Sequence, residues 1–186
     1  MPPDQVTAKK TEQAARDCGA VRTAWITPQD IPVDPGFRTS CEMNQCGAYG
    51  CRWSCPPAIA DVEVLHEDLL SCSAAMVFQA DFPVGDIFDY EAMEEGAKAF
   101  YALCRCLEKR LDEISKDRFF VLGAGACREC RICTYPKAPC VRSRGPVLSL
   151  EAYGVDVTGL VKAARLPYNV SPELVTYTGL VLCRGD

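Results

Sequence analysis

Four cysteines within one short stretch constrain the fold of this chain more than any other feature of its sequence. They form a C-x2-C-x2-C-x6-C run directly after the apolar segment 119–122, at Cys127, Cys130, Cys133 and Cys140. Gaps of two residues curl the backbone so that successive sulfur atoms point toward one centre, and the fourth cysteine closes it. We therefore expect residues 127–140 to fold around a metal or a metal cluster.

The spacing in this run favours an iron–sulfur cluster over a single zinc ion. Ferredoxin-type motifs hold a cubane cluster with three thiolates from a tight loop and one from beyond it. Zinc sites more often combine two C-x2-C pairs that are separated by roughly a dozen residues or more. The prediction for this loop is a [4Fe-4S] cluster, with zinc as the alternative.

A second cysteine group lies upstream, within residues 41–57. Gly47 and Gly50 permit the tight turns that a wrapped metal site needs. The spacing is looser than that of a ferredoxin motif, so a zinc site, or binding by only some of the cysteines, stays open. Tyr49 and Trp53 are interpreted either as a shield against water or as core aromatics, and the two interpretations are compatible. The predicted ligands are Cys41, Cys46 and Cys55, with Cys51 as the candidate fourth.

Length and charge exclude several classes of protein. The chain has 186 residues, enough for one domain with a proper core, and its formal net charge is -5. An acidic chain lacks the basic surface that nucleic acids and anionic membranes require. No apolar run is long enough to span a bilayer, and the first residues lack the apolar stretch of a secretory signal. We expect a cytoplasmic protein with no nucleic-acid and no membrane partner.

The chain contains 13 cysteines, which is far more than packing alone requires. A reducing compartment keeps cysteines out of disulfides, so metal binding is their expected role, in an anaerobic or redox-protected setting. Cys104 and Cys106 are two residues apart on a predicted helix and face different directions. The cysteines outside the two groups are expected to be free and structural: Cys18, Cys72, Cys104, Cys106 and Cys183.

Other polar residues carry weaker signals. His66, the single histidine, is expected to be a solvated or core residue rather than a ligand. Gly123 and Gly125 lack the third glycine of a nucleotide-binding fingerprint. Four arginines surround the second cysteine group and either serve solubility, offset an anionic cluster, or dock an acidic partner or substrate. They are Arg128, Arg131, Arg142 and Arg144.

The remaining sequence alternates between helical and extended patterns, which predicts an α/β fold with a central mixed sheet, covering helices and two cysteine-rich metal-binding loops. The longest predicted helix carries an apolar stripe at Phe100, Cys104, Leu107, Leu111 and Ile114. Residues 1–186 are expected to form a single domain. Helices are predicted at 7–18, 60–70, 91–116 and 156–164, strands at 20–26, 74–82, 119–122 and 175–182, and loops at 27–38 and 83–89.

Several separated motifs together resemble one family, the domain-of-unknown-function family 2284 of cysteine-rich metal-binding proteins. The resemblance runs from about Cys41 to the C-terminus and implies metal binding, as iron–sulfur clusters, in an anaerobic cytoplasm; it implies no particular reaction. The family pattern does not demand a cysteine at the position of Cys51. The motifs are Cys46-Gly-Ala-Tyr-Gly, Trp53-Ser-Cys55-Pro-Pro, Gly-Ala-Cys127-x2-Cys130-x2-Cys133, Pro139-Cys140, Ser149-Leu-Glu151-Ala-Tyr-Gly-Val-Asp156-Val and Tyr177-Thr-Gly-Leu-Val.

The function expected from the sequence is electron transfer by two [4Fe-4S] clusters to a redox protein partner or a small-molecule substrate. A first alternative is an iron–sulfur enzyme whose N-terminal cluster has only three cysteine ligands and an open iron for reductive or sulfur-handling chemistry. A second alternative is a zinc-stapled structural module without a redox role.

Overall fold

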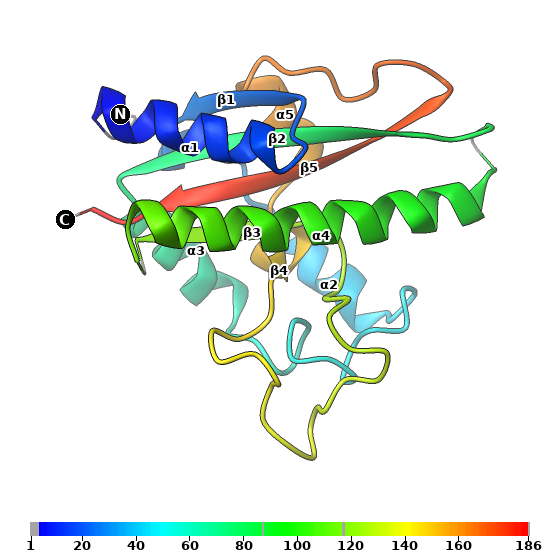
Figure 1. Cartoon of the computed structure of the whole chain (residues 1–186). Coiled ribbons are helices and arrows are strands. Elements are labelled where there is room, and N and C mark those ends of the chain that lie inside the picture. The colour runs from blue at the N-terminus through cyan, green and yellow to red at the C-terminus, as the bar shows by residue number, and fades with distance from the viewer. Residues whose placement is uncertain (1–3, 87, 117, 186) are drawn as a thin grey trace.

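A five-stranded sheet organises the molecule (Figure 1). The computed structural model describes residues 4–86, 88–116 and 118–185. The strand order is β1-β2-β5-β3-β4, and every pair is antiparallel except β3 and β4, so the sheet is mixed as predicted. The strands are β1 (Arg22–Ile26), β2 (Ala74–Pro83), β3 (Phe119–Gly123), β4 (Leu148–Ser149) and β5 (Leu174–Cys183).

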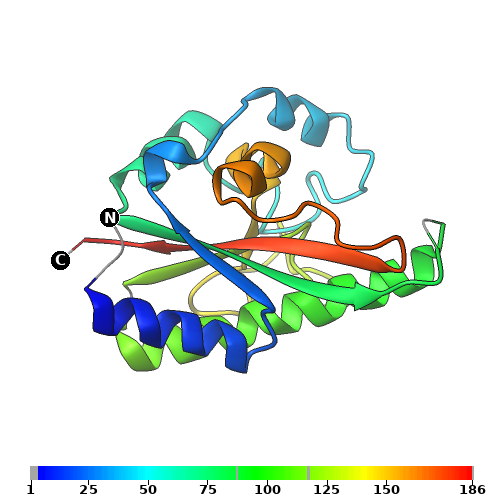
Figure 2. The ribbon, with the colours of Figure 1, turned by 90° about the horizontal axis from the view of Figure 1, so that it is seen from above.

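Two helices cover one face of the sheet, α1 (Gln5–Asp17) and α4 (Tyr90–Ile114), as Figure 2 shows. The predicted apolar stripe of α4 is confirmed for Phe100, Cys104, Leu107 and Leu111, which are buried against the strands, while Ile114 is half-buried at the edge of this core. Phe100 stacks between Phe78 of β2 and Tyr177 of β5.

The opposite face is covered by shorter elements that enclose a second core (Figure 2). Leu69, Leu150 and Leu160 lie at its centre and are fully buried. The elements on this side are the 3-10 helices η1 (Pro28–Asp30) and η2 (Glu151–Tyr153) and the helices α2 (Gly36–Glu42), α3 (Val62–Ser71) and α5 (Val157–Ala163).

All eight predicted helices and strands are present, and each begins and ends within two residues of its expected position. The predicted loop over 27–38 is partly wrong, because it contains η1 and the start of α2. The two-residue strand β4 is too short to show a periodicity in the sequence, and only its pairing with β3 defines it. The predicted loop 83–89 includes residue 87, which lies outside the described residues.

The five cysteines outside the two groups are expected to be free, and this expectation is wrong for two of them. Cys18 and Cys106 form a disulfide between the end of α1 and the middle of α4, with their Cα atoms 5.7 Å apart. They are 88 residues apart in the chain, and only the packing of α1 on α4 brings them together. Cys72, Cys104 and Cys183 are free and buried as predicted, and burial strongly raises the pKa of Cys104.

Gly179 of β5 offers a test of the packing at the centre of the sheet. A Cβ atom at this position would lie 2.3 Å from the Phe78 ring and 2.7 Å from the Leu122 carbonyl oxygen. The Gly179→Ala substitution must therefore displace β2 or β3, and we expect it to lower the free energy of unfolding by about 2 kcal/mol or more. Chemical denaturation of both proteins measures the difference.

Gly185→Ala is the matched control, because its Cβ would lie 3.8 Å from Cβ of Ser73, which is an ordinary van der Waals contact. Its free energy of unfolding should stay within about 0.5 kcal/mol of wild type. Equal stability of the two alanine variants would contradict the tight packing at Gly179.

Candidate metal centre

Both cysteine groups lie on loops at the same edge of the molecule, below the sheet in Figure 1. The downstream loop, 124–147, leaves the carboxyl end of β3 and returns into β4. The upstream loop, 43–61, connects α2 to α3, and Cys41 itself lies on α2. A site at the carboxyl end of a strand is where α/β folds commonly place functional groups, as the sequence predicts for 127–140.

Trp53 joins the two loops. Its indole nitrogen donates hydrogen bonds to the Thr134 hydroxyl at 3.2 Å and to the Ala138 carbonyl oxygen at 3.0 Å. The edge of one ring meets the face of the other where Trp53 contacts Tyr135, with ring centroids 4.9 Å apart. Trp53 therefore packs on the downstream cysteine loop, where a ring can exclude water, rather than in the core of the sheet.

Ser54 lies between cysteines of the two groups. Its buried hydroxyl accepts a hydrogen bond from the Cys127 backbone N–H at 3.0 Å and lies 3.5 Å from Sγ of Cys55. Beside it, the Arg52 guanidinium donates to the Cys127 carbonyl oxygen at 3.1 Å. One predicted ligand from each group is thus adjacent to the same serine.

The downstream cysteines surround a small cavity that Trp53 and Ser54 also line. All four predicted ligands contribute to its wall: Cys127, Cys130, Cys133 and Cys140. Burial raises the pKa of Cys130, and the neighbouring thiols of Cys127, Cys133 and Cys140 raise it further. Mutual repulsion between these groups is what a bound cation would relieve, because ligand thiols bind as thiolates.

The upstream cysteines form a looser group. Burial raises the pKa of Cys55, the Ser54 hydroxyl opposes that shift, and the thiols of Cys46 and Cys41 add to it. Burial also raises the pKa of Cys41, which the Arg38 guanidinium opposes and which Cys46 and Glu151 increase. Cys51 is exposed. The structure thus brings Cys41, Cys46 and Cys55 into one electrostatic neighbourhood.

The arginines near the downstream cysteines tie that loop to α4. Arg128 pairs with Glu94, Arg142 pairs with Glu108 at 2.6 Å, and Arg144 pairs with Asp112. A reversed pair joins Arg105 of α4 to Glu129 of the loop at 2.9 Å. Three of the four arginines therefore have a structural partner on α4, while Arg131 is exposed.

Tyr101 of α4 is a site residue that the sequence did not indicate. Its hydroxyl lies 3.2 Å from Sγ of Cys127 and 3.2 Å from a Glu129 carboxylate oxygen. Burial and the contact with Cys127 strongly raise the pKa of Tyr101, so the phenol stays protonated and can donate a hydrogen bond to a thiolate. No local pattern marks Tyr101, because it is separated from Cys127 by β3 and by the turn that precedes it.

The residues present fit a metal group whose ligands are sulfur. Eight free cysteines converge on the two loops, whereas His66 lies on α3 and is not part of the group. Among residues 4–86, 88–116 and 118–185, no three His, Cys, Asp or Glu side chains are arranged to hold a single metal ion. Thiolate ligands select soft metals and iron–sulfur clusters.

Fold and site together define a cysteine-rich metal-binding protein built on a mixed α/β sheet. The chain belongs to the domain-of-unknown-function family 2284, described as predicted metal-binding proteins, whose profile matches residues 24–183. No curated protein and no solved structure gives a significant match. Within the part of the chain that the structure describes, no helix is long and apolar enough to cross a membrane.

Ser54→Ala tests the contact between the loops. The variant leaves the Cys127 N–H without its acceptor, so we expect the free energy of unfolding to fall by about 1–3 kcal/mol. Ser40→Ala, at an exposed position on α2, is the control and should change it by less than about 0.5 kcal/mol. Denaturant titration of both variants measures these changes. If Ser54→Ala left the free energy of unfolding unchanged, the loops would be held by other contacts.

Proposed function

We propose that this protein holds two [4Fe-4S] clusters and acts as an electron carrier or oxidoreductase for a redox protein partner or a small-molecule substrate. The ligands are Cys127, Cys130, Cys133 and Cys140 for one cluster, and Cys41, Cys46 and Cys55 with Cys51 for the other. Each cluster supplies one-electron chemistry when bound. A cytoplasmic, anaerobic setting is part of the proposal.

The observation that carries this proposal is the junction at Ser54. Its hydroxyl contacts both the backbone of Cys127 and the thiol of Cys55, which are predicted ligands of different clusters. The adjacent residue, Trp53, also joins the two loops through its hydrogen bonds to Thr134 and Ala138. Two redox groups in adjacent sites suit electron relay, because electron transfer weakens steeply with distance.

The spacing of the cysteines supports clusters over zinc. The downstream run is C-x2-C-x2-C with a fourth cysteine seven residues further on. Ferredoxin-type motifs hold a cubane cluster with three thiolates from such a tight loop and one from beyond it. Zinc sites more often combine two C-x2-C pairs that are separated by roughly a dozen residues or more.

The surroundings of Cys127 favour a tuned redox site over a purely structural one. The Tyr101 hydroxyl reaches its sulfur atom, and the Arg52 guanidinium binds its carbonyl oxygen. Hydrogen bonds and cations near the sulfur atoms of a cluster stabilise its reduced state, which is more negative, and so raise the reduction potential of the cluster.

Metal analysis of protein purified without oxygen tests the proposal. We expect roughly eight irons per chain with matching acid-labile sulfide, as two cubane clusters require. About one or two zinc ions without sulfide would overturn the redox function and leave a zinc-stapled module.

A second candidate function is an enzyme whose N-terminal cluster keeps an iron open to substrate. Two observations favour this enzyme: Cys51 is exposed, and the thiols that raise the pKa of Cys55 are those of Cys46 and Cys41. A cavity of about 620 Å³ is lined by Glu151 of η2 and by Arg128 of the downstream loop. Glu151 is in turn an electrostatic neighbour of Cys41.

The Cys51→Ser variant separates the two candidates. If Cys51 is a ligand, the variant should lose about four of its irons, since one cubane is lost. Cys46→Ser is the matched variant and should lose the same cluster under either arrangement, while Cys72→Ser, at a buried cysteine outside both groups, should retain all iron. Full iron content in Cys51→Ser alone would establish the three-cysteine site.

A further inference from the structure

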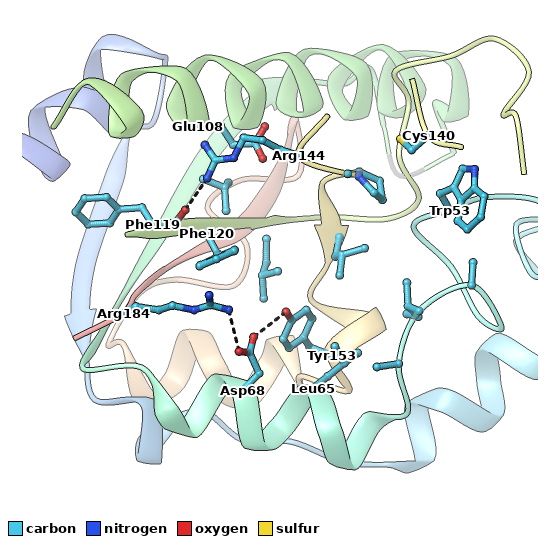
Figure 3. A pocket seen from close by; sticks show the side chains of 18 of the residues that line it. Trp53, Leu65, Asp68, Glu108, Phe119, Phe120, Cys140, Arg144, Tyr153 and Arg184 are labelled. Atoms are coloured by element: carbon cyan, nitrogen blue, oxygen red, sulfur yellow. Dashed lines mark hydrogen bonds and ion pairs between the residues drawn. The ribbon is translucent and has the colours of Figure 1, made fainter. Parts of the chain in front are cut away.

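A third cavity lies next to the downstream cysteine loop and is larger than the small cavity that the four downstream cysteines line. It has a volume of about 570 Å³ and opens between the edge of the sheet, α3 and the segment 139–146. Figure 3 shows its lining side chains, which come from several elements. A cavity of this size can enclose a small organic molecule.

The body of this cavity is apolar and partly aromatic. Phe120 and Leu122 of β3 contribute the wall on the α3 side of the sheet. Leu65 of α3 lies across the cavity from Phe120 (Figure 3). Phe119 also borders the cavity, but it belongs to the core on the α4 side. The Arg184 guanidinium lies over the Phe120 ring, 4.1 Å from its centroid. Flat faces of this kind favour a flat ligand that can stack on them.

The charged groups at the margins of the cavity are already paired. At one end, Asp68 accepts a hydrogen bond from Arg184 at 3.1 Å and a longer one from the Tyr153 hydroxyl at 3.5 Å. At the other end, Glu108 is held by Arg142 and Arg105, at 2.6 and 2.7 Å. Among the described residues that line the cavity, no carboxylate is left over for a cationic ligand.

The cations at the margins are occupied in the same way. Arg144 pairs with Asp112 and also donates to the Phe119 carbonyl oxygen at 3.4 Å. Arg184 pairs with Asp68. A charged ligand would have to displace one of these pairs. A neutral carbonyl would not, because a guanidinium has five N–H donors and Arg184 can bind Asp68 and a carbonyl oxygen together.

The cavity shares a wall with the proposed downstream cluster. Trp53, Cys140 and Pro146 line both this cavity and the small cavity enclosed by the four downstream cysteines. Figure 3 places Cys140 and Trp53 at the same end of the larger cavity. A molecule bound there would lie directly against the cysteine loop.

We propose that this cavity binds a neutral, planar carbonyl compound of the quinone class. The apolar aromatic walls supply the stacking surface, and the Arg184 guanidinium at the margin supplies a donor for a carbonyl oxygen. The choice of a redox-active ligand rests on the proposed electron-transfer function, whereas the neutrality and planarity of the ligand rest on the cavity alone.

Calorimetric titration with 2,3-dimethyl-1,4-naphthoquinone tests this site, using the metal-loaded full chain. Both reactive ring carbons of this probe are methylated, so cysteine thiols cannot add to it. We expect saturable binding, and binding of the anionic probe 1-naphthoate that is weaker by at least about tenfold. Absence of quinone binding, or equal binding of 1-naphthoate, would overturn the proposal.

Two variants locate the binding. Ala60→Trp places an indole at an exposed position of the cavity lining and should weaken binding by at least about tenfold. Val64→Trp adds the same side chain at a position of α3 that is 55% exposed, and it should bind within about twofold of wild type. Unchanged affinity in Ala60→Trp would show that the probe binds elsewhere.

Phe120→Ala keeps the test valid if Ala60→Trp does not fold. It removes one stacking surface and should weaken quinone binding by about tenfold. Iron and sulfide are measured on the same samples. Binding that depends on Ala60 and Phe120 in a zinc-containing, sulfide-free protein would retain the cavity site and reject the redox function. If the protein contained two clusters and did not bind the quinone, the redox function would be retained and the cavity site rejected.

Discussion

The contact between the two cysteine loops is the interaction on which the candidate site depends. Neither loop has a hydrophobic core of its own, and Cys46 and Cys51 are exposed. Their positions are fixed by Trp53, which donates to two groups of the downstream loop, and by Ser54, which accepts from Cys127. The Arg52 guanidinium adds a third contact, to the Cys127 carbonyl oxygen. These three neighbouring residues of the upstream loop therefore hold the two cysteine groups together.

Helix α4 transmits the rigidity of the sheet to this site. One stripe of the helix, including Phe100 and Leu107, is buried against the strands. A second stripe carries polar side chains that bind the downstream loop, and its spacing of three, four and seven residues places them on one face of the helix. Its members are Glu94, Tyr101, Arg105, Glu108 and Asp112. The loop is therefore held by a helix that the core already fixes.

The sequence predicted features that depend on near neighbours and missed those that depend on distant ones. Helical spacing along α4 is local, and the structure confirms the helix. The C-x2-C-x2-C run is local too; its cysteines line one cavity, and their role as cluster ligands stays a prediction. The Cys18–Cys106 disulfide joins residues 88 positions apart. The pairing of β4 with β3 and the contact of Tyr101 with Cys127 likewise exist only after the chain has folded. The ion pairs of Arg128 with Glu94 and of Arg142 with Glu108 could not be predicted either, because the sequence does not distinguish a paired charge from a solvated one.

The two cysteine groups differ in how firmly the fold holds them. The downstream group follows β3, borders α4 and encloses a defined cavity. The upstream group begins on the short helix α2, whose contact with η2 brings Glu151 near Cys41, and two of its four cysteines, Cys46 and Cys51, are exposed. Electron relay needs fixed geometry, because the transfer rate falls steeply with distance. Under the proposed function, the downstream group is therefore better suited to pass electrons to a molecule in the adjoining cavity, which Cys140 lines.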